Sequence, residues 1–144
     1  MKVERMTAAQ LDGVCALENA CFAHPWSRQS LQESLENDNA LFFAATENGE
    51  VIGYIGMSYV LDEGYLYNVA VAPHYRRRGV GSALIRTLVT WCKKENFAFL
   101  TLEVRQSNAA ARSLYEAFGF VKVGERKNYY TEPTENAVLM TLYF

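Results

Sequence analysis

A short run of arginine and glycine has the clearest chemical meaning in the sequence: it reads Arg76-Arg77-Arg78-Gly79-Val80-Gly81-Ser82. The run lies between a pattern typical of a buried strand and one typical of a helix, so its glycines permit a tight turn while free main-chain amides point toward an anion. The guanidinium groups and the helix dipole together favour a pyrophosphate over a single carboxylate. A turn with a solvated basic patch is the alternative, and the glycine spacing alone leaves both open.

The same residues exclude two common phosphate-binding motifs. A dinucleotide-binding fingerprint needs a third glycine at position 84, where this chain has Leu84, and a P-loop needs a Gly-Lys-Ser/Thr ending that is absent. The sequence therefore supports neither hydride transfer nor ATP hydrolysis.

An acidic residue inside an apolar strand is the second candidate for chemistry. Alternation over residues 99–104 places Thr101 and Glu103 on one face of the strand and the leucine and valine side chains on the other. Burial of an unpaired carboxylate is costly, so Glu103 needs either a partner or a chemical role. From the residues alone, a salt bridge is the simpler interpretation.

Four further polar residues have structural explanations. Tyr115 falls inside a helix predicted over residues 109–118, where it fits an amphipathic core aromatic. Asn108 precedes that helix and is a good N-cap residue. Tyr129 and Tyr130 precede the last strand, where paired aromatics commonly serve packing or a hairpin.

Periodicity and turn chemistry predict the elements that position these residues. In chain order they are a strand at 2–6, helices beginning at 7 and 27, strands at 41–47, 51–60 and 65–71, a helix at 79–96, a strand at 97–104, a helix at 109–118, and strands at 120–126 and 137–143. Thr7 and Gln10 have capping-box spacing, and Asn48-Gly49 suits a tight hairpin. A turn at 62–64 precedes strand 65–71, whose apolar run indicates cover on both faces.

These elements predict one α/β domain over residues 1–144. The strand, helix and strand over 65–104 form a right-handed crossover with parallel strands. The remaining connections are short, so the sheet is mixed, mostly antiparallel and flanked by helices.

Composition excludes several classes of function. The formal net charge of -2 provides no global field for nucleic acid, and the first seven residues carry charges without an apolar run, so we expect no signal peptide or membrane association. The three cysteines lack zinc or redox spacing, so free thiols in a reducing cytoplasm are expected, with no metal ion. A metal site of Cys15, Cys21 and His24 is a weak alternative, because helix packing explains both cysteines.

The arginine and glycine run resembles the pyrophosphate loop of the GCN5-related N-acetyltransferase (GNAT) family. The family pattern Gln/Arg-x-x-Gly-x-Gly/Ala is met by Arg76, Gly79 and Gly81. The similarity continues in the family's order through residues 67–71, 102–105, 108–111 and 114–120, and it covers roughly the whole chain. It implies a GNAT-like fold with a β-α-β core that binds acetyl-CoA.

The resemblance also implies roles for individual residues. The implied cofactor-binding residues are Val69, Ala70, Val71, Arg76, Arg77, Arg78, Gly79, Val80, Gly81, Ser82 and Asn108. The first three would offer main-chain amides to the thioester if their strand parts from its neighbour. Glu103 would take the proton of the amine, Tyr115 would protonate the departing thiolate, and Tyr129 and Tyr130 would shape the acceptor pocket.

Residues 128–130 and 135–137 resemble the bacterial branch that acetylates the N-terminal alanine of a small-subunit ribosomal protein, although Thr131 stands where that branch commonly has proline. The implied acceptor is therefore a protein N-terminus. At neutral pH a neutral α-amine costs about 1.4 kcal/mol and a neutral lysine about 4.6 kcal/mol, which also favours an α-amine. A small amine or lysine acceptor remains an alternative, as does a non-catalytic acyl-CoA-binding module, which would need neither Glu103 nor Tyr115.

Overall fold

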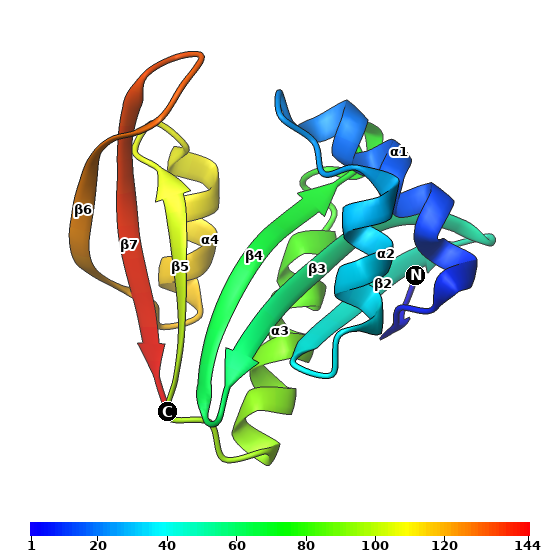
Figure 1. Cartoon of the computed structure of the whole chain (residues 1–144), viewed down its shortest axis with the longest axis horizontal. Coiled ribbons are helices and arrows are strands. Elements are labelled where there is room, and N and C mark those ends of the chain that lie inside the picture. The colour runs from blue at the N-terminus through cyan, green and yellow to red at the C-terminus, as the bar shows by residue number, and fades with distance from the viewer.

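The computed structural model describes residues 1–144 as a seven-stranded sheet with helices on both faces (Figure 1). The strands are β1 (Lys2–Arg5), β2 (Ala40–Glu47), β3 (Glu50–Val60), β4 (Glu63–Val71), β5 (Phe99–Arg105), β6 (Val121–Tyr130) and β7 (Glu135–Tyr143). The helices are α1 (Leu11–Cys21), α2 (Arg28–Glu36), α3 (Val80–Lys94) and α4 (Ala109–Ala117), with short 3-10 turns at Ala8–Gln10 and Pro73–Tyr75. The strand order is β1-β2-β3-β4-β5-β7-β6, and only β4 and β5 run parallel. The predicted mixed, mostly antiparallel sheet is confirmed.

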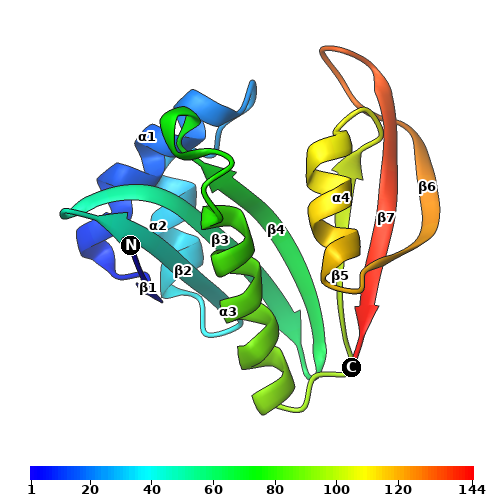
Figure 2. The ribbon, with the colours of Figure 1, turned by 180° about the vertical axis from the view of Figure 1, so that it is seen from behind.

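The helices divide between the two faces of the sheet. Helices α1 and α2 cover β2, β3 and β4 on one face, while α3 and α4 lie on the opposite face (Figures 1 and 2). Leu84, Ile85 and Leu88 of α3 are fully buried in the larger hydrophobic cluster, and Val14 of α1 is fully buried in the smaller one. On the face that carries α1 and α2, no helix covers β5, β7 and β6 (Figure 1).

The sheet splits between its two parallel strands. Strand β4 pairs with β5 only where residues 63–65 lie beside residues 99–101. Beyond Tyr65 the two strands diverge, and the widening gap is visible in Figures 1 and 2. Residues 66–71 of β4 therefore have β3 on one side and no strand on the other.

The hairpin turn and the helix caps predicted from the sequence are present in the structure. Asn48 and Gly49 take positive φ values of 51° and 79° in the hairpin between β2 and β3. Thr7 and Gln10 form the predicted capping box, and the Ser27 side chain accepts a hydrogen bond from the amide of Ser30 at 3.1 Å. The sequence therefore set these element boundaries through contacts between near neighbours.

Two predictions about β4 were wrong. The turn before it consists of residues 61–62, and Gly64 lies inside the strand. An added Cβ at Gly64 would lie 3.1 Å from Cδ1 of Leu100, so this glycine permits close approach of β5 and does not form the turn. The strand is also not covered on both faces, because Tyr65 is 49% exposed.

The last hairpin is longer than predicted. Strands β6 and β7 pair as expected, but β6 continues to Tyr130, so both Tyr129 and Tyr130 belong to the strand. The pairing shifts between Arg126 and Tyr130, where Asn128 has a φ of 52°. This irregularity re-aims the aromatic pair at the end of β6.

No helix in the chain has both the length and the apolar composition that crossing a membrane requires.

Candidate functional site

The turn before α3 presents unpaired main-chain amides to a cavity of about 660 Å³, which we call the loop cavity. Gly79 is the N-cap residue, with a φ of 81° and no capping side chain. The first amide of α3 to bond within the helix is that of Ala83, which donates to the Gly79 carbonyl at 3.0 Å. The amides of Val80, Gly81 and Ser82 consequently lack helical partners, and all three residues line the cavity. Such a helix N-terminus binds anions.

The three arginines of the turn do not share one environment. Arg76 and Arg77 line the loop cavity, and the positive φ of 64° at Arg77 bends the turn around it. Arg76 Nε also donates to the Val71 carbonyl at 3.2 Å, which ties the turn to the end of β4. Arg78 is not among the lining residues, and its guanidinium lies over the ring of Tyr75 at 5.4 Å. Two of the three predicted arginines are thus brought to the cavity.

Strand β4 supplies a second set of amides to the loop cavity. The Ala72 amide donates to Ile52 of β3 at 2.8 Å, and in an antiparallel ladder the direction alternates with each residue. Ala70 therefore also faces β3, whereas the amides of Val69 and Val71 face the side where β5 has separated. All three predicted β4 residues line the cavity, and two of them carry free donors.

Helix α4 forms the opposite wall of the loop cavity. Asn108 caps this helix by accepting from the Ala111 amide at 3.1 Å, as predicted, and it also lines the cavity. Tyr115 lines it too, is 7% exposed and packs on Phe120, with ring centroids 5.6 Å apart. Burial raises the pKa of the Tyr115 phenol, so the side chain is neutral and available as a donor.

Gly81 lies where α3 approaches α4, and the space beside it is tight. A Cβ added at Gly81 would lie 3.2 Å from Cδ2 of Leu114 and 3.8 Å from Cγ2 of Val71. A larger side chain would enter the loop cavity between the free amides and α4. The residues therefore fit a ligand whose diphosphate lies at the start of α3, as the coenzyme A moiety requires.

Glu103 lies in a different cavity of about 710 Å³, the Glu103 cavity, which is lined mainly by residues of β4, β5, β6 and β7. Its Oε1 atom is 3.3 Å from Nε of Arg126, so the salt bridge that the residue type suggested exists. The Tyr129 hydroxyl is within reach of the same carboxylate, whose hydrogen bonding and negative charge raise the pKa of that phenol. The second oxygen, Oε2, is buried without a well-formed hydrogen bond. Arg126 therefore orients the carboxylate through one oxygen, and the other oxygen is enclosed by the protein.

The tyrosine pair lines the same cavity as Glu103. The rings of Tyr129 and Tyr130 meet edge to face with centroids 5.1 Å apart. Burial, reinforced by the charge of Glu103, raises the pKa of Tyr130 to about 12. Tyr130 in turn contributes to the raised pKa of Tyr115 in the loop cavity. The two candidate acid and base residues thus occupy adjoining cavities, with Tyr130 between them.

Strand β4 connects the two cavities where it leaves β5. Its residues 66–68 line the Glu103 cavity, and its residues 69–71 line the loop cavity. A ligand in the loop cavity can therefore reach along the free edge of β4 toward Glu103. This juxtaposition is the central geometric property of the site.

Sequence reasoning missed several residues that line the Glu103 cavity. Trp26, which lies between α1 and α2, lines this cavity and packs edge to face on Tyr67, with ring centroids 5.0 Å apart. Its position is fixed by the buried Glu18, whose Oε1 accepts from the Trp26 amide at 3.2 Å and whose pKa is raised by burial. Trp26 follows Pro25 in the segment between two helices, and this position was the feature of the sequence that could have indicated a role in the site. No comparable feature of the sequence marks Arg126.

Comparisons with known proteins agree with this fold. The family model described as acetyltransferase (GNAT) family matches residues 11–120. The [ribosomal protein bS18]-alanine N-acetyltransferase of Escherichia coli K12 is 37% identical over 142 residues, which cover 97% of this chain and 95% of that protein. The protein of that name from Haemophilus influenzae is 36% identical and covers 98% and 97%. The crystal structure of the E. coli ribosomal-protein-S18-alanine N-acetyltransferase superposes with a TM-score of 0.92 over 99% of this chain and 92% of that chain.

Proposed function

The chain belongs to the acetyltransferase (GNAT) family, and on this premise we propose that it transfers the acetyl group of acetyl-CoA to the N-terminal alanine of ribosomal protein bS18. Relatives bearing this activity in their names align over nearly the whole chain. The observation that carries the proposal is that Glu103 lines one cavity with the part of β4 that has left β5. An acceptor of this kind would place the reaction in the cytoplasm.

The loop cavity holds the donor in this proposal. The amides of Val80, Gly81 and Ser82 bind the diphosphate, with charge from Arg76 and Arg77. The pantetheine arm, which contains amide groups, then runs along the free edge of β4 as an added strand would. Its thioester carbonyl meets the free β4 amides, which stabilise the negative charge that develops on oxygen during attack.

The Glu103 cavity holds the acceptor amine. The Glu103 carboxylate accepts the proton of the amine, directly or through one water, as the nitrogen attacks the thioester carbon. Arg126 at 3.3 Å fixes one oxygen, so the carboxylate has a defined orientation before the amine arrives. Because an α-amine has a pKa of about 8 and lysine one of about 10.4, a single carboxylate suits the α-amine better.

Tyr115 completes the transfer on the donor side. As the tetrahedral intermediate collapses, the carbon–sulfur bond breaks and the sulfur gains negative charge. The neutral phenol donates to that sulfur and supplies the proton of the coenzyme A thiol. The phenol is protonated at neutral pH, and its place in the loop cavity, not its raised pKa, supports the donor role.

The test uses two peptides that differ in the amine they offer. One carries the N-terminal residues of bS18 with a free alanine; the other has the same sequence with a formylated N-terminus and one added lysine. Incubation with acetyl-CoA and mass spectrometry should show one acetyl group on the first peptide and none on the second. Acetylation of lysine without acetylation of the free N-terminus would refute the proposed function.

A further inference from the structure

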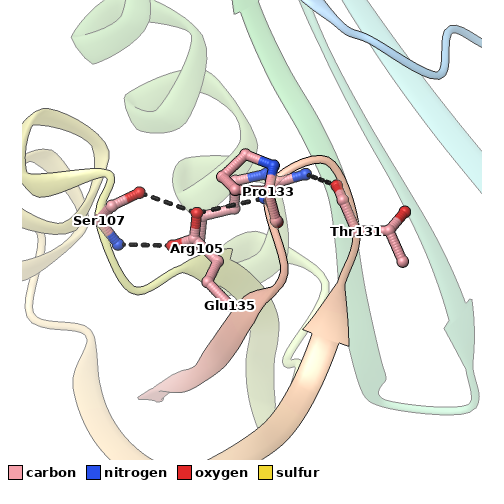
Figure 3. A network of polar contacts seen from close by, with 5 residues as sticks. All are labelled: Arg105, Ser107, Thr131, Pro133 and Glu135. Atoms are coloured by element: carbon pink, nitrogen blue, oxygen red, sulfur yellow. Dashed lines mark hydrogen bonds and ion pairs between the residues drawn. The ribbon is translucent and has the colours of Figure 1, made fainter.

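An ion-paired cluster ties the loop between β6 and β7 to the end of β5 (Figure 3). Arg105 donates to the carbonyl oxygens of Thr131 at 2.8 Å and Pro133 at 3.0 Å, and to Glu135 Oε2 at 3.2 Å. Glu135 in turn accepts from the amide of Ser107 at 2.8 Å and from its hydroxyl at 3.0 Å. A single guanidinium thus engages three acceptors in a planar fork, which lysine cannot reproduce.

The same guanidinium supports a wall of the Glu103 cavity. It lies over the ring of Tyr130 with its central carbon 4.5 Å from the ring centroid. Tyr130 lines that cavity and is paired with Glu135 in the sheet register. Arg105 therefore holds both the aromatic wall and the loop that follows it.

Little else holds this loop. Residues 131–134 are all exposed, and the pairing of β6 with β7 is already irregular before Tyr130. The other side-chain contact of the loop, between Glu132 and His24 at 3.4 Å, joins two exposed groups. Exposed pairs of this kind contribute little, so the position of the loop depends on Arg105.

The cluster is better protected than a surface ion pair. The Arg105 and Glu135 side chains are 28% and 14% exposed. Hydrogen bonds from the Ser107 amide and hydroxyl, followed by the Arg105 guanidinium, lower the pKa of Glu135. The charged state of the cluster therefore persists at neutral pH and is lost only as the pH falls below the usual range of a glutamate.

We propose that Arg105 and Glu135 are positioning residues: by fixing the loop 131–134 they hold Tyr130 in the wall of the acceptor site. They do not touch the reacting atoms; they act by keeping Tyr130 in the cavity that Glu103 also lines. This inference rests on the proposed function, because it assigns the Glu103 cavity to the acceptor. Loosening the cluster should weaken acceptor binding and leave the loop cavity intact, since no residue of the loop 131–134 lines it.

The test compares Arg105→Lys with Arg28→Lys, which makes the same chemical change at an exposed ion pair with Asp12. Steady-state rates are measured with the bS18 peptide at saturating acetyl-CoA, and then with acetyl-CoA varied at fixed peptide. Arg105→Lys should raise the KM for the peptide about tenfold or more, while the KM for acetyl-CoA stays within about twofold of wild type. Arg28→Lys should change neither constant.

The Arg105→Lys, Glu135→Gln double variant tests whether the two residues act as one unit. Each single change disrupts the same cluster, so the double variant should be no worse than the poorer single variant. The inference would be overturned if the two single changes multiplied their effects on the peptide KM in the double variant. It would also be overturned if Arg105→Lys raised the KM values for peptide and acetyl-CoA equally, or left the peptide KM at the value of Arg28→Lys. If wild-type protein leaves the peptide unmodified, the proposed function itself fails, so the two failures are distinguishable.

Discussion

Replacing Glu103 by glutamine removes the proposed base and retains the shape of the site. The glutamine side chain is nearly isosteric with glutamate and keeps an oxygen near Arg126 and Tyr129, so the cavity should stay folded. Glu125→Gln is the matched control, because Glu125 also lies 3.5 Å from a basic residue, Lys122, in an exposed pair outside both cavities.

The expected magnitude follows from the proposed role of Glu103 as the base. A positioned general base contributes about 10²- to 10⁴-fold, so kcat/KM for the α-amine peptide should fall at least about a hundredfold at pH 7. The variant can use only amine that is already neutral. Deprotonation of an amine with a pKa of about 8 costs about 1.4 kcal/mol at pH 7. The rate of the variant should therefore rise about tenfold per pH unit below pH 8 and level off above it, so the loss is greatest at low pH.

The assay measures release of the coenzyme A thiol between pH 6 and pH 9, with calorimetry for acetyl-CoA binding. Glu103→Gln should bind acetyl-CoA like wild type, and Glu125→Gln should match wild type in both rate and pH dependence. A pH profile for Glu103→Gln that coincides with wild type would refute the assignment of Glu103 as the base.

Three further predictions concern the donor site, the core and a thiol. Gly81→Glu should weaken acetyl-CoA binding by about a thousandfold, because a negative charge about 4 Å from the diphosphate repels it by about 4 kcal/mol. Calorimetry measures this affinity, and Thr90→Glu, at an exposed position of the same helix, is the control. Leu84→Ala should lower the free energy of unfolding by about 2–5 kcal/mol, measured in urea, because this side chain is fully buried. Burial raises the pKa of Cys92 from 9.0 to about 12, so its neutral thiol favours the folded state below pH 9.0, a contribution lost as the pH rises toward about 12. In the folded protein at pH 7, a thiol-alkylating reagent should therefore modify only Cys15 and Cys21, and it should modify Cys92 only in denaturant. Mass spectrometry counts the modified thiols.

The donor side of the site was largely predictable from the sequence. The anion-binding turn depends on Gly79 and Gly81 and on the start of α3, all within a few residues of one another. The alternation that sets Glu103 apart from Leu102 and Val104 is also local, and the observed burial follows it. The sequence left undecided whether Glu103 has a partner; in the structure Arg126 pairs with one carboxylate oxygen, and the Tyr129 hydroxyl lies within reach of the carboxylate.

The acceptor side required tertiary structure. Arg126 reaches Glu103, and Arg105 reaches Glu135 across 30 residues, only because β5, β7 and β6 pair in a particular register with an irregularity near Asn128. Arg78 likewise turns from the loop cavity to Tyr75, although its sequence context matches that of its neighbours.

Short-range preferences thus determined the caps, the hairpin turn and the amide-rich turn, because each depends on dihedral angles and hydrogen bonds among adjacent residues. The split between β4 and β5, and with it the meeting of the two cavities, was decided by packing. Strand separation depends on the side chains that many distant segments bring to both faces of the sheet, and no local pattern encodes that balance.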